Sequence, residues 1–170
     1  SAAPLTLAST IPLEKNLTLS GAGHEIVISG NNAVRIFAVN QGLTVTLEHL
    51  TLQNGMVNDG SDGGAINDNG SFLTLSDMRF ENNHAGTDIG DGGELFHYTV
   101  GSLTILDCVF DGNSAGHYGG AIFNRASADI TDSVFTDNSA YQGGAYLNYS
   151  ADKTTTFERV TLSGNTAIGP

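Results

Sequence analysis

The chain has 170 residues, which is enough for one domain with a sizeable core. Its formal net charge is −12, from 18 acidic side chains against 6 lysines and arginines, and this argues against nucleic-acid binding and against docking on an anionic membrane. Only 14% of the residues are charged, 39% are hydrophobic and 22 are glycines, which favours a turn-rich β protein over a helical or disordered chain.

The N-terminal part shows short apolar segments separated by turn sequences. The segments are residues 5–7, 17–19, 26–28 and 36–39. Ser-Gly-Ala-Gly at 20–23 and Ser-Gly-Asn-Asn at 29–32 fall between them and favour turns. We therefore expect short strands here. No apolar run reaches the 18 residues of a membrane span, so we expect no membrane insertion of this segment.

A repeat occupies the rest of the chain. Glycine pairs stand at 63–64, 92–93, 119–120 and 143–144. A nine-residue phrase that ends in Asn or Gly aligns without a gap at 47–55, 75–83, 105–113, 130–138 and 157–165. Each unit contains three short segments in which apolar and polar residues alternate, the signature of half-buried strands.

Three short strands in about 25 residues describe one coil of a solenoid. We therefore predict a single all-β domain over 1–170, a right-handed parallel β-helix of about six to seven coils. The domain is either whole or a fragment of a longer surface protein. Because the ends of a solenoid need covering, we also expect end-to-end packing or capping by an adjacent domain.

The repeated phrases have a structural explanation, because every coil turns the same corner. The closing residues are expected to tolerate left-handed backbone, and their stacked Asn amides to bond along the axis. These residues are Gly55, Asn83, Asn113, Asn138 and Asn165. The glycine pair is expected to permit a second tight bend. The lone cysteine, Cys108, is expected to be a buried, inert thiol.

Gly-Gly-Ala-Ile at 119–122, with Phe-x-x-Asn at 110–113, resembles the paired repeat motifs of the polymorphic outer-membrane proteins. Their passenger domains are right-handed β-helices. The stretch from Lys15 to Gly55 also resembles the start of many bacterial surface β-helix proteins of the pectin-lyase-like superfamily. The resemblance covers most of the chain and implies an extracellular or cell-surface, often adhesive, domain. The chain departs from the motif at residues 53–55, 92–95 and 143–146.

The third strand of each coil suggests a binding surface. If Leu95 and Ile122 point inward, then Phe96, Phe123 and Leu147 point outward, and Glu94 supports that phase because an unpaired carboxylate is costly inside. We predict an exposed apolar stripe that binds a ligand. Its residues are Phe96, Phe123, Leu147, Tyr98 and Tyr118. A covering loop or neighbouring domain is the alternative explanation.

Acidic residues give a weaker metal hypothesis. An acidic group is expected in the loops: Asp59, Asp62, Asp68, Asp88 and Asp91. Of these, Asp59, Asp62, Asp88 and Asp91 are the candidate calcium ligands. A second set occupies one aligned turn: His49, Asp77, Asp107, Asp132 and Arg159. These are either turn residues or, as in the pectate lyases, a carboxylate ladder. The five histidines share no repeat position and are expected at the surface or in turns.

The leading functional hypothesis is a non-catalytic adhesion or ligand-binding module. Its partner would be a host or neighbouring cell-surface protein or a glycan, and no cofactor is required beyond possible calcium in the loops. The alternatives are a polysaccharide-active enzyme (lyase or hydrolase) or carbohydrate-binding domain of the pectin-lyase-like superfamily, and a structural spacer. Enzymatic activity is left open, with the balance against it.

Overall fold

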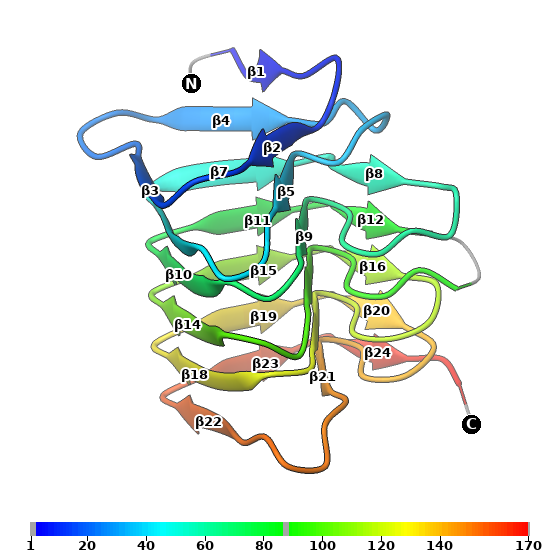
Figure 1. Cartoon of the computed structure of the whole chain (residues 1–170). Helices are drawn as coiled ribbons and strands as arrows, with labels where there is room; N and C mark the ends of the chain where they lie inside the picture. The colour runs from blue at the N-terminus through cyan, green and yellow to red at the C-terminus, as the bar shows by residue number, and fades with distance from the viewer. Residues whose placement is uncertain (1–2, 87–88, 170) are drawn as a thin grey trace.

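The computed structural model describes residues 3–86 and 89–169, and all of their regular structure is β. The strands form four parallel sheets that the chain visits in turn (Figure 1). Sheet A contains β1 (Leu5–Thr6), β4 (Ile26–Ser29), β7 (Leu50–Gln53), β11 (Arg79–Glu81), β15 (Val109–Asp111), β19 (Val134–Thr136) and β23 (Thr161–Ser163). Sheet B contains β2 (Ile11–Leu13), β5 (Phe37–Val39), β9 (Ile66–Asp68), β13 (Leu95–His97), β17 (Ile122–Asn124) and β21 (Tyr146–Asn148).

Two further sheets complete each coil. Sheet C contains β3 (Leu17–Ser20), β6 (Thr44–Glu48), β10 (Phe72–Ser76), β14 (Ser102–Leu106), β18 (Ser127–Thr131) and β22 (Thr155–Glu158). Sheet D contains β8 (Met56–Val57), β12 (His84–Ala85), β16 (Ser114–Ala115), β20 (Ser139–Ala140) and β24 (Thr166–Ala167). Sheets B and C have six strands each, so the chain makes about six turns. The predicted parallel β-helix is confirmed, and right-handed crossovers are the rule between parallel strands.

Sheet D is the part of the coil that the sequence did not predict. From the third coil onward, a two-residue strand follows the closing Asn or Gly and pairs with its equivalents above and below. Two residues are too short to show an alternating pattern, so this strand carries no sequence signal of its own. Among the described residues no helix is long and apolar enough to cross a membrane.

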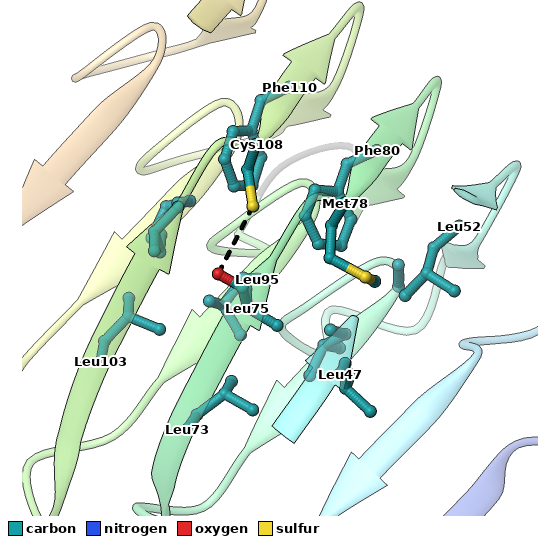
Figure 2. Close-up of a cluster of buried hydrophobic side chains, with 14 of the residues drawn as sticks. Leu47, Leu52, Leu73, Leu75, Met78, Phe80, Leu95, Leu103, Cys108 and Phe110 are labelled. Atoms are coloured by element: carbon teal, nitrogen blue, oxygen red, sulfur yellow. Dashed lines mark hydrogen bonds between the residues drawn. The ribbon is translucent and has the colours of Figure 1, made fainter. Parts of the chain in front are cut away.

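The interior is one continuous apolar cluster in which like residues stack on like. In sheet C, Leu73 lies between Val45 and Leu103, and Leu75 lies between Leu47 and Ile105. Three phenylalanines of sheet A stack in successive coils, and Figure 2 shows two of them, Phe80 and Phe110. The ring centroids of Phe80 and Phe110 are 4.7 Å apart, and those of Phe110 and Phe135 are 4.5 Å apart. Cys108 is buried among these residues, as expected, and burial raises the pKa of its thiol to about 12.

The closing asparagines form a hydrogen-bonded ladder along the axis. The Asn113 side-chain oxygen accepts the backbone N–H of Asn83 at 3.0 Å, and the Asn138 side-chain oxygen accepts that of Asn113 at 2.9 Å. The Asn113 amide nitrogen donates to the carbonyl of Phe80. The predicted stacking of amides is confirmed. The predicted left-handed backbone at these residues is wrong, because it belongs to the residue before. Left-handed φ angles occur at Asn54, Asn82, Gly112, Asp137 and Gly164.

The two glycines of each pair have different structural roles. Gly119 has a φ of 63°, which favours glycine. A Cβ on Gly120 would lie 1.9 Å from the carbonyl oxygen of Gly144 in the next coil, so the second position has no room for a side chain. The next two residues, Ala121 and Ile122, both donate their N–H groups to the carbonyl of Ala145. This is a β-bulge, and both of its residues are fully buried.

The aligned turn between sheets C and A explains the second acidic set. All five of its residues have φ between 51° and 54°: His49, Asp77, Asp107, Asp132 and Arg159. Aspartate tolerates left-handed backbone better than most residues. Arg159 forms an ion pair with Asp132. The turn explanation of these aspartates is therefore supported by the backbone itself.

Apolar side chains are exposed at both ends of the described coils. Leu5 is 60% exposed at one end, and Phe157 and Leu162 are 45% and 60% exposed at the other. The covering of these ends by another segment or chain stays a prediction.

Candidate binding surface on the outer face of sheet B

The central residues of the sheet B strands form the outward column that the sequence predicted. Phe96 pairs in register with Asn67 and Phe123, and Phe123 pairs with Leu147. Their neighbours Leu95 and Ile122 belong to the interior cluster, whereas Phe96 and Phe123 do not. The predicted phase of the strand, with Leu95 and Ile122 inside, is therefore confirmed.

The predicted exposure of the two phenylalanines is wrong. Phe96 is only 8% exposed and Phe123 only 3%. Their rings stack on each other at 5.3 Å. Tyr118 stacks over Phe123 at 5.8 Å, and Tyr149 packs against it at 5.9 Å. Tyrosines thus cover the phenylalanines outside the coil, and the covering comes from the same chain rather than from another domain.

The exposed layer of this surface is a column at the end of sheet B. Tyr98, Arg125 and Tyr149 occupy one position in three successive coils, because each follows the last residue of its strand. Their backbone N–H groups donate to the coil before. The Arg125 guanidinium carbon lies 5.2 Å from the Tyr98 ring centroid and 5.7 Å from that of Tyr149. Tyr98 is 38% exposed and Tyr149 57%.

We call the group of six residues the outer aromatic cluster. It consists of Phe96, Tyr98, Tyr118, Phe123, Arg125 and Tyr149. His117 extends it towards the loops, since its ring stacks on Tyr118 at 3.5 Å. Leu147, the remaining predicted member, is half-buried next to Phe123 in the register. The ligand-binding role of these residues stays a prediction.

The calcium candidates in the loops act as backbone acceptors. One carboxylate oxygen of Asp62 accepts the N–H of Asp91 at 3.0 Å, and one of Asp91 accepts the N–H of Tyr118 at 3.2 Å. Asp59 accepts the N–H of Ser61 within its own turn. Burial, followed by the charge of Asp62, raises the pKa of Asp91 to about 6. Burial also raises the pKa of Asp62.

Asp88 lies outside the described residues. Across 3–86 and 89–169, no three His, Cys, Asp or Glu side chains gather as a metal site would require. Asp62 and Asp91 instead hold the next coil, and Asp59 holds its own turn. Calcium binding stays a prediction.

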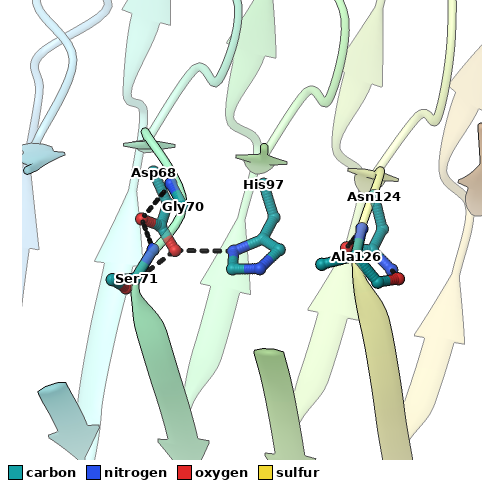
Figure 3. Close-up of polar contacts among 6 residues, drawn as sticks. All are labelled: Asp68, Gly70, Ser71, His97, Asn124 and Ala126. Atoms are coloured by element: carbon teal, nitrogen blue, oxygen red, sulfur yellow. Dashed lines mark hydrogen bonds and ion pairs between the residues drawn. The ribbon is translucent and has the colours of Figure 1, made fainter. Parts of the chain in front are cut away.

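A buried polar column was missed by the sequence reasoning. Asp68 and His97 lie inside the coil and are fully buried, and their Oδ2 and Nδ1 atoms are 2.6 Å apart (Figure 3). Asp68 also accepts the N–H groups of Gly70 and Ser71 and the Ser71 hydroxyl. The expected surface position of His97 and the expected loop position of Asp68 are therefore wrong, since Asp68 is the buried last residue of β9. A signal existed, because period two places Asp68 and His97 on the same face as Ile66 and Leu95.

Glu94 is also inside, which corrects the argument that used it. Its side chain is fully buried, and Asn83 donates its amide N–H to Oε2 at 2.5 Å. The bulge explains the error, since both residues after the glycine pair face inward and Glu94 occupies the site that alanine fills in other coils. Burial raises the pKa of Glu94 well above its ordinary value.

The repeats match known surface proteins. Residues 107–125 match the Chlamydia polymorphic membrane protein repeat. The chain is 31% identical over 184 aligned positions to the probable outer membrane protein pmp7 of Chlamydia pneumoniae, covering 94% of this chain and 18% of that protein. It is 28% identical over 115 residues to the probable autotransporter YfaL of Escherichia coli (strain K12), covering 64% of this chain and 9% of that protein. No solved structure matches the chain.

The chain therefore spans less than a fifth of the length of the relatives it matches. The expected extracellular or cell-surface location agrees with both relatives, an autotransporter and an outer-membrane protein. The matched segment contains the Phe-x-x-Asn corner and the Gly-Gly-Ala-Ile bulge described above. The chain is a surface β-helix module built from repeats of the polymorphic membrane protein type.

Proposed function

We propose that this module is a non-catalytic adhesion or ligand-binding unit, with the outer aromatic cluster as its contact surface. One observation carries the proposal: two stacked phenylalanines lie outside the closed core, beneath half-exposed tyrosines and an arginine. The coil closes without them, since its own apolar cluster is continuous. A structural spacer has no need of a second aromatic cluster of this kind.

The composition of the cluster supports recognition. Tyrosine and arginine are enriched at protein contact surfaces and among the residues that dominate binding energy there. Tyr98 and Tyr149 each present an apolar ring and a hydroxyl to a partner. Their rings are held by the column and the packed phenylalanines, so less conformational entropy is lost on binding than with freely rotating side chains.

The contacts of the acidic side chains support a non-catalytic function less directly. Asp68 and His97 form a close pair, but both are sealed inside the coil. Asp62 and Asp91 each use one carboxylate oxygen to hold the next coil. These contacts give Asp62, Asp68 and Asp91 structural roles that require no substrate.

A retention assay tests the proposal. The purified module and a Tyr98→Ala/Tyr149→Ala variant are screened against intact cells, immobilised glycans and surface-protein extracts, with the supernatant checked for released sugar. We expect retention of the wild type without released product, and at least a tenfold loss in the variant. Phe72→Ala is the matched control, because Phe72 is an exposed aromatic residue (52%) on sheet C, outside the cluster.

The outcomes separate the alternatives. Equal retention of wild type and double variant would place the contact surface elsewhere. Released oligosaccharide would favour the polysaccharide-active enzyme. No retention to any surface would leave the spacer as the better explanation.

A further inference from the structure

Arg125 differs from the other arginines in what holds it. Arg79 and Arg159 pair with carboxylates. Arg35 donates to the backbone carbonyls of Asp62 and Gly63 and lies near acidic side chains. Within the described part of the chain, the Arg125 guanidinium has neither an ion pair nor a hydrogen bond, and its Nε is buried without a partner. This is unusual in a chain with three acidic residues for every basic one.

The two tyrosines fix how this cation meets a ligand. Tyr98 lies one coil before Arg125 and Tyr149 one coil after, so their rings flank the guanidinium on opposite sides along the axis. A guanidinium carries all its donors in its own plane. With its two sides flanked by rings, it can meet a ligand through the edge between them. That edge matches the paired oxygens of a carboxylate or sulfate.

The surroundings favour a sugar as the carrier of the acid group. A shallow groove beside the column is lined by Asn148, Tyr149, Ser150 and Ala151. It combines an exposed aromatic ring with amide and hydroxyl groups, which suits a sugar ring that has one apolar C–H face and a rim of hydroxyls. The outward residues of the adjoining strands are Asn67, Phe96, Phe123 and Leu147, none of them acidic.

We propose that the Tyr98–Arg125–Tyr149 column binds an acidic glycan, with its carboxylate or sulfate on the edge of Arg125 and an adjoining sugar ring on Tyr149. The inference rests on the proposed function and names the ligand chemistry of that surface. The net charge of −12 repels densely charged polyanions at long range. The fitting ligand is therefore a glycan with isolated acid groups.

Three small sugars test which acid group the column prefers. Binding of 3′-sialyllactose, 3′-sulfolactose and neutral lactose to the whole module is measured by calorimetry at about 0.15 M salt, where the Debye length is about 8 Å and the overall repulsion is screened. We expect one or both acidic sugars to bind at least tenfold more tightly than lactose. Preference for the sialylated or the sulfated probe identifies the acid group.

Variants of Arg125 provide the second part of the test. Arg125→Gln should abolish the preference for acidic sugars, and Arg125→Lys should restore only part of it, since an ammonium lacks the planar edge. Arg79→Gln is the matched control, an exposed arginine on sheet A whose loss should change nothing. Thermal unfolding of each variant confirms that it is folded.

The inference and the proposed function fail differently. Equal binding of lactose and the acidic sugars, no binding of acidic sugars at millimolar concentration, or undiminished preference in Arg125→Gln would each overturn the inference. If the module is nevertheless retained on cells through Tyr98 and Tyr149, the proposed function stands with another ligand. Acid-specific binding that Arg125→Gln removes would support both.

Discussion

Two phenylalanine stacks occupy neighbouring sides of the same part of the solenoid and are buried in different ways. Phe80, Phe110 and Phe135 are fully buried inside the solenoid. Phe96 and Phe123 are almost as well buried, yet they lie outside it, under tyrosines. The inner stack is enclosed by the closed coil, and the outer stack by tyrosine side chains that are themselves partly exposed. Exposure alone therefore does not show which residues support the fold.

The sharpest test of this difference is to remove one ring from each stack. Phe110→Ala should cost about 3–5 kcal/mol of unfolding free energy, because it leaves a cavity between two rings that the closed coil cannot fill. Phe123→Ala should cost about 1–2 kcal/mol, because Tyr118 and Tyr149 can settle into the space. Urea unfolding of both variants provides the measurement. Equal losses would show that the outer stack is part of the core after all.

The degree of burial also sets how much unfolding free energy is lost when an asparagine of the ladder is removed. Asn113→Ala removes the acceptor of the buried Asn83 N–H and the donor to the Phe80 carbonyl. The expected loss is about 2–3 kcal/mol, the cost of buried groups left without partners. Asn165→Ala should cost clearly less, because Asn165 is only part-buried and water can replace its bonds. A ladder in which both variants lose the same amount would contradict this account.

Glu94 provides a smaller test, one that depends on pH. Its pKa is raised in the folded state by burial, so above about pH 4.5 the unfolded chain releases this proton while the folded chain keeps it. The Glu94 contribution to stability therefore falls as pH rises, by up to about 1.4 kcal/mol per unit until the folded pKa is reached. Glu94→Gln should be more stable than wild type at pH 8, with the gap closing near pH 4.

Chemical denaturation across that range measures the effect. Glu94→Ala, which restores the residue found in the other coils, should flatten the pH dependence in the same way, and the Asn83 amide keeps the Leu52 carbonyl and the Asn113 side-chain oxygen as acceptors. If the gap between wild type and Glu94→Gln stays constant from pH 4 to pH 8, Glu94 is not the source of the pH dependence.

Much of the fold could be predicted because the same sequence pattern recurs in successive coils. Period two along the strands identified Leu95 and Ile122 as interior residues, and the gapless phrase around Asn113 predicted the corner and its stacked amides. One mistake came from the bulge, where two successive residues face inward and alternation fails. That local exception hid Glu94, and a second error came from the prior that histidines lie at the surface, which misplaced His97.

The candidate site was predicted in part, for a physical reason. The sequence showed that Phe96 and Phe123 share the outer face, because both occupy the same strand position. It did not show that Tyr118 and Tyr149 cover them, since these residues flank the strands and the direction of their side chains follows no period-two pattern. The spacing did carry a signal for the column, because Tyr98, Arg125 and Tyr149 each stand six residues after the first glycine of a pair. The contacts between the guanidinium and the two rings become visible only in the structure.

The direction of the hydrogen bonds has a mechanical consequence. Both the sheet ladders and the asparagine ladder run along the solenoid axis, from each coil to the next. A pull along that axis on the chain of a terminal coil concentrates the load on the few bonds nearest the point of attachment, while in deeper coils the same force is shared among all the bonds between two coils. Such a module should yield under tension one coil at a time from its ends. The outer aromatic cluster lies on coils four to six, so force that enters this segment from its C-terminal side reaches the cluster before it reaches the first three coils.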